Sequence, residues 1–134
     1  MRLLGASGAG NGAGDRVRVL VVDDSHDNRE LAAAVLEASG FAVLTAGNGL
    51  EGVIVAHYAR PAVIVMDIMM PVLDGIEAAR LLRASTVTQD LPLVAYTAKP
   101  RFEDGSLTHV FSEVVRKPSS PDALADVVRR LAER

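Results

Sequence analysis

The chain has 134 residues, a net charge of −3 and no cysteine. The length suits one domain, and the missing cysteine excludes a disulfide scaffold, a thiolate zinc site and a cysteine nucleophile. The acidic balance argues against direct nucleic-acid binding. No apolar run approaches the roughly 20 residues of a membrane span, and no signal peptide opens the chain. We therefore expect a cytoplasmic protein without membrane contact.

Glycine is concentrated at the N-terminus, where residues 1–14 hold five of the eleven glycines. Such a composition is typical of a flexible linker. A dinucleotide-binding fingerprint over residues 8–12 (GAGNG) would need a strand before it and a helix after it. A strand-like run follows instead. We predict a flexible Gly/Ala-rich tail over residues 1–15 and one folded domain over residues 16–134.

Short apolar runs alternate with amphipathic segments through the rest of the chain. Strands are expected at residues 17–22, 41–45, 62–66, 91–96 and 113–115, and helices at residues 27–40, 50–59, 74–82 and 120–131. This alternation predicts an α/β fold with a parallel sheet that helices cover on both faces. Pro100, Gly105 and few periodic apolar residues predict a weak or irregular fourth helix over residues 98–110.

Several local patterns predict where the helices begin and which faces they bury. Two acidic pairs have the spacing of a capping box, namely Asp27 with Glu30 and Asp74 with Glu77. Ser120 followed by Pro121 predicts the start of the last helix. Leu31, Val35 and Leu36 recur at helical spacing and predict the buried face of the first helix.

Polar side chains stand where the predicted strands end: Asp23 and Asp24 after the first, Asp67 after the third, Thr97 after the fourth and Lys117 after the fifth. The carboxyl ends of parallel strands meet at one edge of the sheet. Converging carboxylates beside one lysine must raise a pKa or bind a cation. Oxygen donors suit Mg²⁺, Mn²⁺ or Ca²⁺ better than zinc. An aspartate beside such an ion can attack phosphorus and form an aspartyl phosphate.

Four motifs, in this order, resemble the receiver domain of two-component response regulators, the CheY-like family. They are VVDDS at 21–25, MDIMMPVLDG at 66–75, YTA at 96–98 and KP at 117–118. The resemblance runs from Val17 to the C-terminus and implies a flavodoxin-like, doubly wound sheet of strand order 2-1-3-4-5. It implies a phosphorelay switch rather than a turnover enzyme. The phosphoryl group would come from a histidine kinase or a histidine phosphotransfer protein, and an unidentified output protein would respond.

The resemblance also implies roles for the acidic residues. Asp67 matches the phosphoacceptor, and Asp23 and Asp24 match the acidic pair that holds Mg²⁺, with Mn²⁺ as a second candidate. Asp24 and Asp67 would be direct carboxylate ligands, and the backbone carbonyl of Met69 a third protein ligand. The side chains of Met69 and Lys99 match positions that tune the lifetime of the phosphoryl group.

The remaining matches concern the phosphate and the switch. Thr97 matches the switch hydroxyl, Ala98 lies in the same phosphate-binding segment, and Lys117 matches the phosphate-pairing lysine. A cis peptide is implied between Lys117 and Pro118, since cis is costly except before proline. Val114 departs from the family, which usually has an aromatic switch residue there. The segment between Thr97 and Lys117 is also about two residues short.

Contacts with other proteins follow from the resemblance as well. The kinase is expected to dock near the first helix. The face formed by residues 98–134 is the expected output surface, and a homodimer, if one forms, is expected through it.

Three alternatives compete with a stand-alone receiver. A phosphatase of the haloacid dehalogenase type would need a second aspartate two residues after Asp67, where Met69 stands. A pseudo-receiver scaffold is opposed by the intact set of Asp24, Asp67, Thr97 and Lys117. A receiver fragment of a hybrid histidine kinase, with residues 1–15 as its linker, stays open. His26, His57 and His109 have no ligand spacing, and Asp74 is expected to be only a helix cap.

Overall fold

The computed structural model describes residues 16–98 and 110–133. Its sheet contains β1 (Arg18–Val22), β2 (Ala42–Ala46), β3 (Val63–Met66), β4 (Leu93–Thr97) and β5 (Glu113–Arg116). All neighbouring strands are parallel, in the order β2-β1-β3-β4-β5. The predicted flavodoxin-like strand order is therefore confirmed. The predictions for residues 1–15 and for a helix within 98–110 lie largely outside the described residues.

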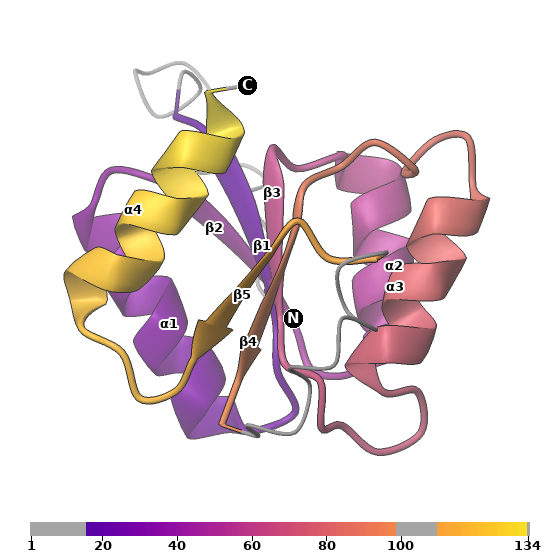
Figure 1. The fold of residues 1–134 in the computed structure, drawn as a ribbon, viewed down its shortest axis with the longest axis horizontal. Helices are drawn as coiled ribbons and strands as arrows, with labels where there is room; N and C mark the ends of the chain where they lie inside the picture. Colours follow the sequence, from indigo (N-terminus) through magenta and orange to yellow (C-terminus); the bar gives the residue numbers. More distant parts are fainter. Residues whose placement is uncertain (1–15, 99–109, 134) are drawn as a thin grey trace.

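Four helices in the described part of the chain cover the sheet: α1 (His26–Ala38), α2 (Gly49–Ala59), α3 (Gly75–Ala84) and α4 (Pro121–Ala132). Figure 1 shows α1 and α4 on one face and α2 and α3 on the other. Covering on both faces explains why the strands are apolar runs without polar alternation. The central strand β3 is buried at all four positions.

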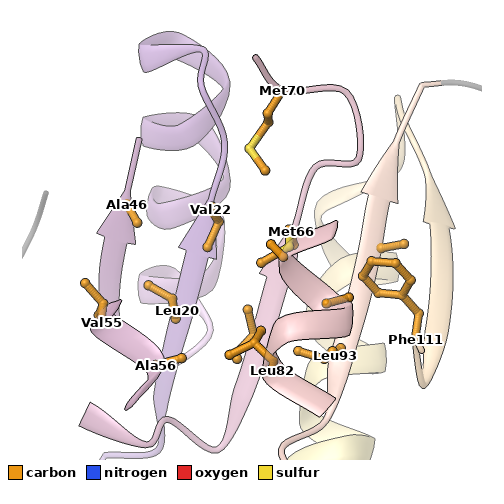
Figure 2. Packing of buried hydrophobic residues seen from close by; sticks show 14 of the residues in the cluster. Leu20, Val22, Ala46, Val55, Ala56, Met66, Met70, Leu82, Leu93 and Phe111 are labelled. Atoms are coloured by element: carbon orange, nitrogen blue, oxygen red, sulfur yellow. The ribbon is translucent and has the colours of Figure 1, made fainter. Parts of the chain in front are cut away.

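The sheet separates two hydrophobic clusters, because successive side chains of a strand point to opposite faces. On the side of α2 and α3, Leu20, Val22 and Met66 pack with Leu82 and Phe111 (Figure 2). The second cluster lies on the other side of the sheet. Its strand residues alternate with those of the first cluster along the same strands. Its members include Val19, Val21, Val94, Leu36 and Leu124. Both clusters are largely aliphatic, as the 4% aromatic content requires.

Two of the three predicted helix starts are confirmed, and one is wrong. Asp74 caps α3 in a capping box with Glu77, and Ser120 caps α4 ahead of Pro121. The first helix begins earlier than the pair Asp27 and Glu30 predicted, because Ser25 is its N-cap. The Ser25 side chain accepts a hydrogen bond from the backbone N–H of Asn28 at 3.3 Å.

The predicted buried face of α1 is confirmed at Leu36, half-buried at Val35 and wrong at Leu31. Leu31 is 66% exposed, whereas Ala32, Ala33 and Leu36 are buried. The alanines thus share the buried face with Leu36, and Leu31 lies on the solvent side of the helix. Periodicity alone could not choose between the two stripes, because both contain apolar residues at helical spacing.

Candidate functional site

Three carboxylates meet at the carboxyl edge of the sheet. Asp23 and Asp24 follow β1, Asp67 follows β3, and these two strands are hydrogen-bonded neighbours with Val22 opposite Met66. The ladder continues one step further, since the backbone N–H of Asp67 donates to the carbonyl of Val22 at 2.9 Å. One ligand oxygen from each of the three carboxylates lies within 4.8 Å of the other two.

Asp23 is buried and held from several sides. Its Oδ1 accepts from the backbone N–H of Ser25 at 3.0 Å, and its Oδ2 lies 2.7 Å from Nζ of Lys117. The guanidinium of Arg29 donates to the Asp23 carbonyl at 2.9 Å. Both carboxylate oxygens of Asp23 therefore have protein partners, whereas Asp24, the next residue, is exposed.

Lys117 reaches this edge from the end of β5. Its Nζ lies 2.7 Å from Oδ2 of Asp23 and 3.9 Å from Oδ2 of Asp67. The same Nζ lies 5.1 Å from the centre of the Tyr96 ring, a cation–π distance. The Tyr96 hydroxyl lies 3.1 Å from Oγ of Ser119. The peptide bond between Lys117 and Pro118 is cis.

The environment raises the pKa of the Asp67 carboxyl above its ordinary value. Burial is the largest cause. The positive charge of Lys117 lowers the pKa, and repulsion from Asp23 and Asp24 raises it further. The backbone N–H of Met69, which donates to Oδ1 of Asp67 at 3.3 Å, also lowers the pKa. One ammonium does not balance three carboxylates, so a further cation would relieve the remaining repulsion.

The positions predicted for the switch and for tuning differ in their burial. Thr97 ends β4 and is buried, and its carbonyl accepts from the backbone N–H of Lys117 at 2.9 Å. Ala98 is exposed. Val114 pairs with Ala95 across the β4–β5 ladder and is 43% exposed. Met69 is half exposed in the loop after β3. Lys99 lies outside the described residues.

The other residues singled out in the sequence offer no carboxylate or ammonium to this cluster, as far as the described residues show. His57 is exposed on α2, and its ring packs edge-on against that of Tyr58. His26 is exposed and contacts Arg29 through Nδ1 at 3.1 Å. Asp74 acts as a helix cap. His109 lies outside the described residues.

Sequence reasoning missed two supports of the site, Arg29 and Gly75. Gly75 opens α3, and a Cβ built there would collide with the Asp67 carbonyl and lie 2.8 Å from Cα of Ile68. Only glycine permits this approach of α3 to the loop that carries Asp67. Gly75 follows Asp74, but nothing in the spacing of that pair distinguishes a close approach from an ordinary helix start.

The fold and the acidic pocket opposite a lysine are those of a signalling receiver module. The family model described as "Response regulator receiver domain" matches residues 19–129, so the chain belongs to that family. Receiver domains are signalling modules rather than conventional enzymes. None of the helices in the part of the chain that the structure describes is long and apolar enough to cross a membrane.

Similar curated proteins include single-domain and longer relatives. The protein PilH of Pseudomonas aeruginosa is 40% identical over 87 residues, which are 65% of this chain and 72% of PilH. The probable transcriptional regulatory protein TcrX of Mycobacterium tuberculosis is 34% identical over 123 residues, 90% of this chain and 52% of TcrX. The chain thus spans about half the length of TcrX.

Solved structures agree over most of the chain. Chemotaxis response regulator CheY4 of Vibrio cholerae has a TM-score of 0.79 at 29% identity, covering 87% of this chain and 98% of that one. The receiver domain of the sensor histidine kinase PA1611 from Pseudomonas aeruginosa has a TM-score of 0.82 at 28% identity, covering 89% and 99%. That receiver carries a magnesium ion coordinated in its active-site cleft.

Proposed function

We propose that this chain takes a phosphoryl group onto Asp67 from the phosphohistidine of a histidine kinase or a histidine phosphotransfer protein. The observation that supports this most is the setting of the Asp67 carboxylate. It lies beside the Lys117–Asp23 ion pair and is grouped with Asp24, with burial raising its pKa. A nucleophile, cation-binding oxygens and a phosphate-pairing ammonium thus stand together at one edge.

The donor set fits Mg²⁺, with Mn²⁺ as the second candidate. All three side chains offer carboxylate oxygens, and the single ammonium leaves excess negative charge. Asp23 already has partners on both oxygens, so we assign direct coordination to Asp24, Asp67 and the Met69 carbonyl, with Asp23 in support. The bound ion would neutralise the charge of the transferring group. The magnesium in the PA1611 receiver domain supports this assignment.

In the proposed transfer, an Asp67 oxygen attacks the phosphorus of the phosphohistidine in line with the leaving nitrogen. A P–O bond forms, the P–N bond breaks, and its electron pair stays on the imidazole, which takes up a proton. Lys117 pairs with the phosphoryl oxygens as a point charge, and the Thr97 hydroxyl donates to one of them. The backbone at Ala98 completes the phosphate-binding segment.

The acyl phosphate would bias two conformations of the domain and thereby control a partner protein. Met69 is half exposed two residues after Asp67, and we infer that its side chain limits the approach of water. Together with Lys99 it is our candidate for tuning the phosphoryl lifetime. We propose the cytoplasm as the location, since the kinase domains that would donate the phosphoryl group act there.

The receiver of a hybrid histidine kinase remains the second candidate. Similar solved structures favour it, because the PA1611 receiver domain belongs to a sensor histidine kinase. The chemistry at Asp67 is the same in both cases, and only the phosphodonor differs.

The test is phosphorylation by a small donor. The full chain is incubated with Mg²⁺ and acetyl phosphate or phosphoramidate, and its intact mass is measured. We expect the addition of one phosphoryl group to the wild-type chain and none to Asp67→Asn. Asp27→Asn serves as the matched control, because Asp27 is an exposed carboxylate on the neighbouring helix α1. A wild-type chain without the adduct, or an adduct on Asp67→Asn, would refute the proposal.

A further inference from the structure

The ammonium of Lys117 has an aromatic neighbour as well as carboxylate neighbours. Its Nζ lies 2.7 Å from Oδ2 of Asp23 and 3.9 Å from Oδ2 of Asp67. The centre of the Tyr96 ring is 5.1 Å from the same Nζ, a distance at which a ring face attracts a cation. The proposed phosphoryl transfer uses Lys117, whereas Tyr96 has no part in it.

Strand geometry places the two side chains on the same face of the sheet. Tyr96 pairs with Val115 across the β4–β5 ladder, and the N–H of Lys117 extends that ladder by donating to the Thr97 carbonyl. Side chains alternate between faces, so Lys117, two residues after Val115, emerges on the face of Val115 and Tyr96. The contact between ring and ammonium therefore follows from the register of β4 and β5.

The Tyr96 ring is held by its own surroundings. It is half-buried and packs against the cluster on the side of α1 and α4, which includes Leu36 and Leu124. Its hydroxyl lies 3.1 Å from Oγ of Ser119, two residues after Lys117. Lysine, by contrast, carries its charge on a flexible four-carbon stem. An ordered ring therefore restricts the positions that the ammonium can take.

A ring can hold the ammonium without occupying it. Asp23 attracts Lys117 by accepting one of its N–H groups, and a lysine has three such donors. The ring attracts the cation through its quadrupole and offers no oxygen acceptor. The remaining donors therefore stay available for phosphoryl oxygens at Asp67.

We propose that Tyr96 is a positioning residue for Lys117, whose ammonium it holds within reach of the phosphoryl group that Asp67 receives. This inference rests on the proposed function, because the transfer is what gives the position of the ammonium its importance. Tyr96 acts only through Lys117. The ring is the part that acts, and the hydroxyl only helps to orient it.

The rate of adduct formation tests the role of the ring. The full chain is incubated with Mg²⁺ and acetyl phosphate, and its intact mass is followed over time. We expect Tyr96→Leu to slow the reaction by about fivefold, and Tyr96→Phe, which keeps the ring, to stay within about twofold of the wild type. Tyr58→Leu is the matched control, because it makes the same change at a tyrosine that is 82% exposed on α2.

A double-mutant cycle separates positioning from packing. Urea unfolding without phosphodonor is measured for the wild type, Tyr96→Leu, Lys117→Met and the chain with both substitutions. If the ring holds the ammonium, the two substitutions are coupled, by about fivefold in the unfolding equilibrium constant. A tyrosine that only fills space would give additive effects. The same cycle on the phosphorylation rate should show no further slowing by Tyr96→Leu once Lys117 is replaced.

Three results would overturn the inference: additive effects on unfolding, an unchanged rate for Tyr96→Leu, or a rate for Tyr96→Phe as low as that for Tyr96→Leu. In each of these cases the wild-type chain still gains its phosphoryl group, so the proposed function stands. A wild-type chain that gains no phosphoryl group would overturn the proposed function and this inference together.

Discussion

At the scale of single residues, burial and ion pairing act on Asp67 in opposite directions. Burial and the neighbouring Asp23 and Asp24 raise its pKa, and Lys117 lowers it. Lys117 lies 2.7 Å from Asp23 but 3.9 Å from Asp67, so its charge is shared unequally. The apo site therefore holds an Asp67 carboxylate whose ionisation disfavours folding, and a cation would reverse that effect.

The pH dependence of stability follows from this raised pKa. Below the ordinary aspartate pKa, Asp67 is protonated in both folded and unfolded chains, so its charge costs nothing. As the pH rises toward the folded-state pKa, the unfolded chain ionises first and the wild type loses stability. Asp67→Asn, which cannot ionise, should therefore be more stable than the apo wild type at neutral pH and should lose this advantage below the ordinary aspartate pKa.

Magnesium should reverse this ranking. At a concentration 100 times the dissociation constant, a ligand that binds only the folded chain stabilises it by about 2.7 kcal/mol. Urea unfolding with and without Mg²⁺, at acidic and neutral pH, measures both effects. An Asp67→Asn chain that responds to Mg²⁺ as strongly as the wild type would contradict the assignment of Asp67 as a ligand.

At the scale of elements, the loop between β3 and α3 is held by a close backbone approach. The backbone N–H of Gly75 donates to the carbonyl of Ile68 at 2.9 Å. The capping box of Asp74 with Glu77 fixes the start of α3 at the same place. The position of Asp67 therefore depends on how closely α3 can approach the end of β3.

Substituting Gly75 by alanine should displace this loop. The added Cβ meets the backbone of Asp67 and Ile68, which cannot rotate away as a side chain could. We expect Gly75→Ala to lower the free energy of unfolding by about 1–3 kcal/mol and to slow phosphorylation by acetyl phosphate. Gly40→Ala is the control, because its Cβ would meet nothing within 4 Å and its positive φ of 98° costs stability away from the site, so phosphorylation should not slow. Equal effects of the two substitutions on phosphorylation would refute this account.

At the scale of the whole molecule, Lys117 links the acidic site to β4 and β5, the strands at one edge of the sheet. The carbonyl of Thr97 accepts from the N–H of Lys117, and Tyr96 pairs with Val115 across the β4–β5 ladder. Val114, which the resemblance to receivers places at the usual aromatic switch position, is aliphatic and 43% exposed. Under the proposed function, we expect a signal from the site to pass through the backbone and the contacts of β4 and β5.

Beryllium fluoride, a phosphoryl mimic, tests that propagation. With Mg²⁺ present, we expect the mimic to shift the backbone amide resonances of Thr97, of residues 98–110 and of β5. Asp67→Asn should show none of these shifts. Shifts confined to Asp23, Asp24 and Asp67 would show that the site binds the mimic without passing a signal to the sheet edge.

The sequence by itself determined the order of the strands and helices. It also determined that the polar residues at the strand ends gather at one edge of the sheet. Alternating apolar runs specify a parallel α/β sheet, and parallel strands must bring their carboxyl ends to one edge. This suffices to gather Asp23, Asp67 and Lys117, although Lys117 is 94 residues from Asp23. It also suffices for the capping box at Asp74, because that signal is local.

Only the tertiary structure decided which apolar residues are covered. Leu31 and Ile54 fit a buried helical stripe, yet both stay at the surface. It also decided that Ser25 rather than Asp27 caps α1, and that Gly75 must approach Asp67. The physical reason is that periodicity gives the faces of an element, whereas burial and close approach depend on which neighbour packs against each face.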